Sequence, residues 1–162
     1  MITTGYCKII RERKIYGYIF EYAENSVEIY PGCEDIKYVM YENGLIEKQI
    51  FDSRTEELKE KTTITKGNDE VIDTISNFYE KNKTIIESIP SDLYNPEVCD
   101  GSSYYIKFFN KEIAGINIFH QCSKNCEVYQ NIKDLIKIRD SFFSVISKNK
   151  IFQEMCNDLY IK

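Results

Sequence analysis

Residues 36–51 read IKYVMYENGLIEKQIF and form the clearest local pattern in this chain of 162 residues. Asn43-Gly44 separates two alternating runs, and this pair is the preferred two-residue turn of a β-hairpin because both positions need a positive φ. That register places Met40 opposite Glu47, so apolar and charged side chains mix on both faces. We therefore expect this hairpin near the edge of a sheet rather than at its centre.

Other stretches predict further strands on both sides of this hairpin. Residues 15–22 place aromatic side chains on one face at a period of two, namely Tyr16, Tyr18, Phe20 and Tyr22. The remaining predicted strands are residues 27–30, 62–66, 104–109 and 112–119, of which the last two form a second hairpin.

Two long helices are predicted from apolar stripes at helical spacing. The first begins after Asn68 or Asp69, either of which can cap it, and ends at Pro90. The second runs from about Cys126 to Lys148, and residues 151–159 predict a short last helix. Strands in series with tight turns favour an antiparallel sheet. The chain is therefore expected to form one α+β domain over residues 1–162, with a mainly antiparallel sheet and both long helices packed on one face.

Composition excludes several classes of protein. The formal net charge is −5 and the isoelectric point is near 5.1, which disfavours a general nucleic-acid binder. No apolar run approaches the 18 or so residues of a membrane span, and the first residues lack the pattern of a secretory signal. A cytoplasmic location with reduced thiols is expected, unless a leader has been removed.

Ligand-type residues gather at only one place in the sequence, His120-x-Cys122-x3-Cys126. A structural zinc site normally needs four ligands in two close pairs, and the spacing supplies no second pair. Cys126 could gain thiolate character at a helix N-terminus, and a Cys–His pair is conceivable. Serine-hydrolase and phosphate-loop motifs do not occur. We predict no catalytic residue, metal or cofactor, with a thiol or metal site at His120, Cys122 and Cys126 as the alternative.

Negative charge is segregated along the chain. Residues 15–36 carry −5 and residues 84–106 carry −4 with no Lys or Arg in either segment, so the rest of the chain carries +4. Segregated charge steers a complementary partner, and Tyr anchors well at interfaces. The predicted partner-binding residues are Glu34, Asp35, Asp92, Tyr94, Glu97, Asp100 and Tyr104.

Residues 99–146 open with CDGSSYYI, continue through a polar loop and end in a helix bearing Leu135, Ile136 and Phe142. This region resembles a loose group of small uncharacterised bacterial α+β proteins, some of them toxin-immunity proteins. The resemblance implies an α+β fold and no catalytic residue. Asp100-Gly101 also has a purely local interpretation as turn residues that lead into a strand.

Two functions follow from these observations. The first is a non-enzymatic protein-binding domain, for example an immunity-type inhibitor whose acidic, Tyr-bearing surface occludes a basic partner such as a toxin domain. No nucleic acid or membrane partner is expected. The alternative is a thiol or metal-site protein that uses His120, Cys122 and Cys126.

Overall fold

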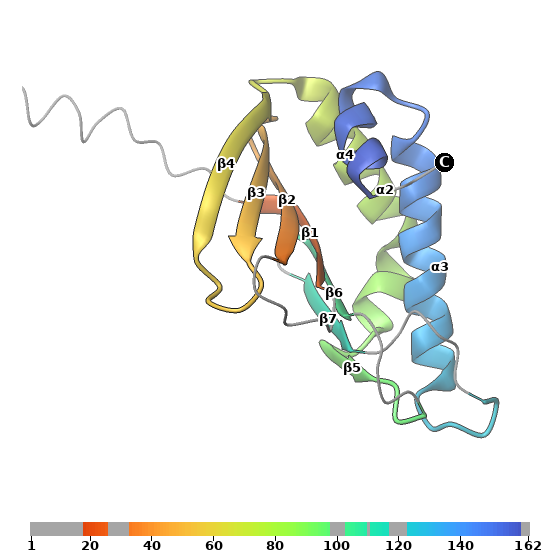
Figure 1. The fold of residues 1–162 in the computed structure, drawn as a ribbon. Helices are drawn as coiled ribbons and strands as arrows, with labels where there is room; N and C mark the ends of the chain where they lie inside the picture. Colours follow the sequence, from red (N-terminus) through yellow and green to blue (C-terminus); the bar gives the residue numbers. More distant parts are fainter. Residues whose placement is uncertain (1–17, 26–32, 98–102, 110, 117–122, 160–162) are drawn as a thin grey trace, which may run out of the picture.

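A computed structural model describes residues 18–25, 33–97, 103–109, 111–116 and 123–159 (Figure 1). The fold is α+β. Its elements run in the order β1 (Tyr18–Asn25), β2 (Glu34–Tyr41), β3 (Ile46–Asp52), β4 (Leu58–Thr65), α2 (Asp69–Ser88), β5 (Asp92–Tyr94), β6 (Ser103–Phe108), β7 (Lys111–Ile116), α3 (Tyr129–Ile146), η1 (Lys150–Phe152) and α4 (Gln153–Asp158). None of the helices in the described ranges is long and apolar enough to cross a bilayer.

The strands form one seven-stranded sheet in the order β4-β3-β2-β1-β6-β7-β5. All pairings are antiparallel except the one between β5 and β7, which is parallel. The predicted second hairpin is matched in part by β6 and β7, because residues 117–119 of its second predicted strand lie outside the described residues. The three-residue strand β5 lies between the first predicted helix and the second hairpin, where no strand is predicted.

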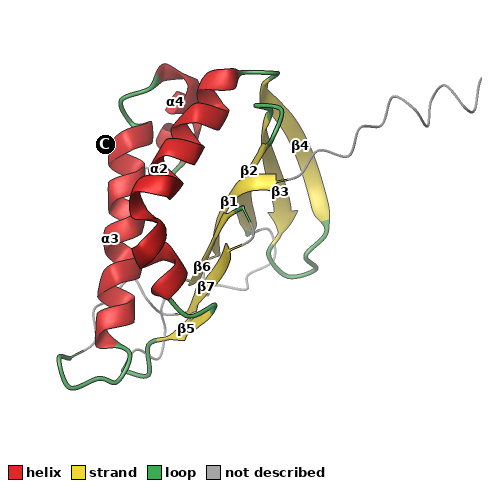
Figure 2. Cartoon of the chain, turned by 180° about the vertical axis from the view of Figure 1, so that it is seen from behind, coloured by secondary structure: helices red, strands yellow, loops and turns green. Residues whose placement is uncertain are grey.

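The long helices α2 and α3 cover one face of the sheet, with α4 beside them (Figures 1 and 2). Their apolar stripes meet the inward side chains of the strands in one core, as predicted from their spacing. Aromatic rings fill its centre, where the ring centroids of Phe20 and Phe142 lie 4.4 Å apart and those of Phe108 and Phe142 lie 5.5 Å apart. Asn68 caps α2, and its side chain accepts a hydrogen bond from the Glu70 N–H at 2.9 Å.

The register predicted for the first hairpin is wrong by one residue. Met40 pairs with Ile46, and Val39 pairs with Glu47. Gly44 has a φ of +77°, but Asn43 is not among the described non-glycine residues with positive φ, so the two-residue turn that needs both cannot form. Instead, a longer connection is closed by backbone hydrogen bonds, in which the Tyr41 N–H donates to the Leu45 carbonyl at 2.9 Å and the Gly44 N–H donates to the Tyr41 carbonyl at 2.9 Å.

This slip decides which side chains enter the core, because a shift of one residue moves every side chain to the other face. Met40 and Ile46 now lie together on the helix side and are fully buried. Val39 and Glu47 lie together on the face that the helices leave open. Gly44 also permits a close approach, because a Cβ there would lie 2.1 Å from the Asn68 carbonyl oxygen.

The hairpin lies near one edge of the sheet rather than at its centre, as expected, although neither of its strands is the edge strand. β2 and β3 lie inside the sheet, because β4 pairs with the free side of β3 and β1 pairs with β2. β4 begins at Leu58, four residues before the predicted strand. α3 begins at Tyr129, three residues after the predicted start. The predicted strand at 27–30 lies outside the described residues.

Candidate functional site

The strand registers bring the two acidic segments to one end of the sheet. Glu34 at the start of β2 pairs with Asp52 at the end of β3. On the other side of β2, the end of β1 pairs with the start of β6, and the start of β6 pairs with the end of β7. Tyr94 at the end of β5 pairs with Ile116 at the end of β7. Glu34 and Tyr94, which are 60 positions apart in sequence, therefore lie along one rim of the sheet.

We call this rim the acidic end. Its carboxylates come from the strand ends, from the turn between β3 and β4, and from the loops that follow β5 and precede α3. They are Glu34, Asp35, Asp52, Glu56, Glu57, Glu97 and Glu127. The described cations in the same places are Arg54, Lys59 and Lys124. The acidic end is therefore negative overall.

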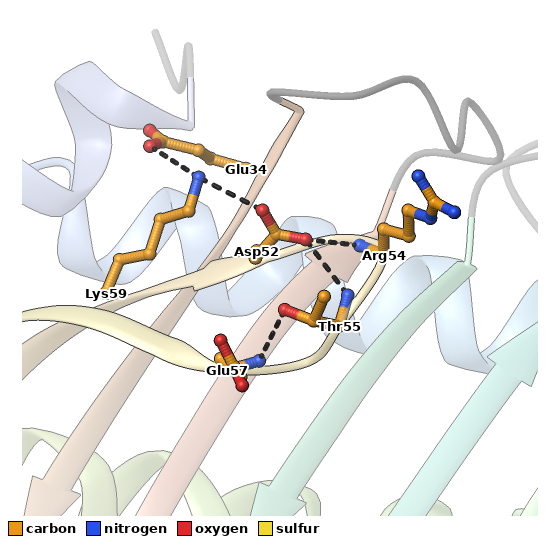
Figure 3. A network of polar contacts seen from close by, with 6 residues as sticks. All are labelled: Glu34, Asp52, Arg54, Thr55, Glu57 and Lys59. Atoms are coloured by element: carbon orange, nitrogen blue, oxygen red, sulfur yellow. Dashed lines mark hydrogen bonds and ion pairs between the residues drawn. The ribbon is translucent and has the colours of Figure 1, made fainter.

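A network of polar contacts orders the part of the acidic end around the β3–β4 turn (Figure 3). Asp52 Oδ1 accepts hydrogen bonds from the N–H groups of Thr55 at 2.9 Å and Arg54 at 3.0 Å. Lys59 Nζ lies 3.2 Å from Asp52 Oδ2. The two backbone hydrogen bonds, followed by the one from Lys59, lower the pKa of Asp52 to about 2. Asp52 thus remains ionised and shapes the turn.

Glu34 and Asp35 point to opposite faces of β2, as neighbouring strand residues do. Glu34 Oε1 lies 3.5 Å from Lys59 Nζ, and both side chains are about half exposed or slightly less, so this ion pair contributes little. Asp35 is partly buried, and its Oδ1 is buried with no hydrogen-bond partner in the described part of the chain.

The loop after β5 is held in place by two polar side chains. Asn95 is fully buried, and its Oδ1 accepts a hydrogen bond from the Glu97 N–H at 3.1 Å. The Glu97 carboxylate accepts hydrogen bonds from the Ser123 hydroxyl at 2.6 Å and the Ser123 N–H at 2.5 Å. These two bonds lower the pKa of Glu97. Glu97 therefore joins the loops that precede and follow the second hairpin.

Exposed apolar groups flank the carboxylates. Tyr94 is 53% exposed on edge strand β5, and Leu58 is 50% exposed on edge strand β4. Between Tyr94 and Glu34 the sheet makes four strand-to-strand steps, or roughly 19 Å. Asp92 lies at the other end of β5 and is exposed. The acidic end thus combines negative charge with an exposed tyrosine.

The structure describes the remaining predicted partner-binding residues only in part. Asp100 lies outside the described residues. Tyr104 lies on β6, where the structure describes its backbone but not its side chain. The two acidic segments do not include Asp52, Glu56 and Glu57, because these segments are defined by the absence of Lys and Arg. A hairpin boundary placed between Phe51 and Leu58 would have indicated them.

The alternative thiol or metal site stays a prediction. His120 and Cys122 lie outside the described residues. Cys126 is a free, partly buried thiol that packs against the core three residues before α3 begins. Its carbonyl accepts a hydrogen bond from the Tyr129 N–H at 3.0 Å. The residues that the structure describes contain no group of three ligand-type side chains placed to hold a metal.

No protein-family model matches the chain, and no curated protein matches its sequence.

Proposed function

We propose that this protein is a non-enzymatic protein-binding domain that uses the acidic end to occlude a basic surface of its partner, in the manner of an immunity-type inhibitor. The observation that carries this proposal is the convergence of Glu34, Asp35, Tyr94 and Glu97 on one rim through four successive strand pairings. Two separate acidic segments would have no reason to share a rim if their charge served only solubility.

The mechanism is stoichiometric binding. The net negative charge of the acidic end steers a basic partner toward the rim and raises the association rate, since electrostatic attraction acts before contact. Tyr94 then buries its ring and slows dissociation, as exposed aromatic anchors do at the centre of an interface. Covering the partner's basic surface prevents it from binding an anionic substrate.

The experiment uses the purified full chain and the purified product of the adjacent gene, because inhibitor and target of this type are expected to be encoded together. Surface plasmon resonance measures association over a range of salt concentrations. Reversing two exposed charges with Glu34→Lys and Glu57→Lys is expected to slow association at least about tenfold and to flatten its salt dependence. Tyr94→Ala is expected to raise the dissociation rate about tenfold.

The matched control reverses two exposed charges elsewhere, Glu60→Lys on β4 and Glu80→Lys on α2. It changes the net charge by the same amount and is expected to retain most of the association rate. An equal loss with both pairs of substitutions would mean that net charge alone matters and that the acidic end is no docking surface. Absence of a complex at about 10 µM contradicts the immunity-type function.

A further inference from the structure

The outer side of the α2–α3 pair carries a groove that the proposed function does not use. Two adjoining depressions, with volumes of about 810 and 530 Å³, follow one another between the helices. The helices run antiparallel on either side of them (Figures 1 and 2). Thr74 on α2 and Val145 on α3 line both depressions, so they mark the middle of the groove. Val145 is 40% exposed, which leaves an apolar surface open at this point.

Short polar side chains line the groove, and their hydrogen-bonding groups are unused. They come from both helices and are Thr74, Asn77, Ser141 and Ser144. None of these four side chains donates or accepts a hydrogen bond within the part of the chain that the structure describes. A hydroxyl both donates and accepts, and so does a side-chain amide, so these groups can serve the N–H and C=O groups of a bound peptide backbone. Because the side chains are short, a peptide can lie close to both helices.

Three lysines lie along the groove without a carboxylate partner. Lys81 lines the larger depression, and Lys148 and Lys150 line the smaller one. Among the described residues, no ion pair or hydrogen bond involves the ammonium group of any of the three. Both ends of the groove therefore present a free cation, which attracts an anion.

The two carboxylates that line the groove are already engaged by other side chains. Glu70 Oε1 accepts a hydrogen bond from Asn149 Nδ2 at 2.7 Å, and Asp140 Oδ1 lies 2.9 Å from Arg139 Nη2. Arg139 offsets the charge of Asp140, so only Glu70 remains to oppose the three lysines. The groove is thus positive, although the chain as a whole has a formal net charge of −5.

The spacing of the lysines selects the conformation of an anionic ligand. From Thr74 to Lys81 the chain rises about 10 Å, and from Val145 to Lys148 it rises about 4 Å in the opposite direction. The free cations therefore lie about 15 Å apart along the groove, with Val145 between them. In an extended peptide, residues i, i+2 and i+4 point to the same side, and residues i and i+4 are about 13 Å apart. In a helical peptide the same two residues would be only about 6 Å apart.

From these observations we infer that the groove binds an extended acidic segment of a partner protein, with carboxylates at positions i and i+4 and an apolar residue at i+2. One carboxylate meets Lys81, and the other meets Lys148 and Lys150. The apolar side chain covers Val145. An extended chain is only about 5 Å wide, so it can lie in the hollow between two helices and fill it. This partner differs from the basic partner proposed for the acidic end, because the charges required are opposite.

The test is an NMR titration of the isotope-labelled full chain with the synthetic peptide GSESVSESG at low salt. This peptide places two glutamates four residues apart with a valine midway. Chemical-shift changes are expected to concentrate in the groove, at Thr74, Ser144 and Val145 above all, with a Kd of about 10–200 µM. The rearranged peptide GSSSEVESG has the same composition but spaces its glutamates two residues apart, or about 7 Å. It is expected to bind at least about fivefold more weakly.

Charge reversal in the groove separates direct contacts from general attraction. K81E and the double substitution K148E/K150E each place a carboxylate opposite one of the peptide's own, and each is expected to weaken binding at least about fivefold. K133E/K137E on α3 is the matched control, because it makes the same change in net charge as K148E/K150E at lysines that do not line the groove. It is expected to bind within about threefold of the wild type. The same spectra report whether each variant is folded.

Any of three results overturns the inference. Absence of shifts in the groove at about 2 mM peptide means that no acidic segment binds there. Equal affinities for the two peptides mean that the spacing of the carboxylates is not recognised. Equal losses with K148E/K150E and K133E/K137E mean that only the net charge of the protein matters.

Discussion

Two carboxylates on opposite faces of β2 and β3 are bound by the same pair of groups, a tyrosine hydroxyl and a lysine ammonium. On the helix side, Asp158 of α4 accepts a hydrogen bond from the Tyr38 hydroxyl and lies 2.6 Å from Lys48 Nζ. On the open side, Glu47 accepts a hydrogen bond from the Tyr41 hydroxyl and lies 3.0 Å from Lys61 Nζ. The chemistry is alike, but the surroundings differ.

The two clusters differ in how accessible the tyrosine and lysine are to water once the carboxylate is removed. Tyr38 is fully buried, and its partner Asp158 is 120 residues away in sequence, so this contact ties the last helix to the sheet. Tyr41 is only partly buried, and the Lys61 side chain is 49% exposed, so water can replace Glu47 for both. Because an unsatisfied buried donor costs more than a lost hydrogen bond, the Asp158 cluster should dominate stability even though Glu47 is the more buried carboxylate.

The largest expected effect follows from Asp158→Ala. It leaves the Tyr38 hydroxyl without an acceptor in the core and Lys48 without its partner. We expect a loss of about 2–3 kcal/mol in the free energy of unfolding. Urea unfolding at pH 7, followed by far-UV circular dichroism, measures it. Glu154→Ala, an exposed change in the same helix, is the control and should cost less than about 0.5 kcal/mol. Equal losses in both variants would contradict the role given to Tyr38.

A smaller effect is expected for Glu47→Ala on the open face. Tyr41 and Lys61 regain water, so the loss should be about 1 kcal/mol in the same urea experiment. If Glu47→Ala destabilises the protein as much as Asp158→Ala does, the Asp158 cluster does not dominate stability. That result would mean that the open face is covered more completely than the exposure of Lys61 indicates.

The sequence predicts the helices and strands that carry these two clusters, but it does not predict the contacts within the clusters, and the reasons are physical. The helical stripes, the Asn68 cap and the alternating runs are local patterns, so the helices and most strands could be predicted. The face on which Glu47 lies could not, because it depends on the φ of Asn43, and the two-residue turn assumed for Asn43-Gly44 sends Glu47 to the wrong side. The Asp158 contact spans 120 residues and leaves no local pattern.

The acidic end could also be predicted only in part from the sequence. Its charge was visible in the sequence as two segments without Lys or Arg. Their meeting on one rim depends on the strand order and on the parallel pairing of the three-residue strand β5, which is too short to give a periodic pattern. The turn that carries Glu56 and Glu57 lies at the rim because β4 begins directly after it, at Leu58.

The Asp158 contact also makes the stability of the protein depend on pH. Burial alone raises the pKa of Asp158, but the hydrogen bonds from Lys48 and Tyr38 outweigh it and lower the pKa. A carboxyl group with a lowered folded pKa contributes stability above its unfolded pKa, near 3.9, and loses it as the pH falls through the folded pKa. The gap in unfolding free energy between the wild type and Asp158→Asn should be constant from about pH 7 to 5 and narrow below about pH 4. A gap that widens in acid would reverse the assigned sign.

The smallest expected effect concerns a carboxylate held mainly by the backbone, Asp52. Its pKa of about 2 is due first to the N–H groups of Thr55 and Arg54 and only then to Lys59. Lys59→Ala should therefore leave Asp52 titrating well below the ordinary value near 3.9, as followed by carboxyl chemical shifts in an NMR titration. Lys59 is exposed enough that its removal should barely alter stability. If the Asp52 pKa instead returned to its ordinary range, the side-chain ammonium rather than the turn would be its cause, and Asp52 would belong with the two lysine-bound carboxylates on the faces of the sheet.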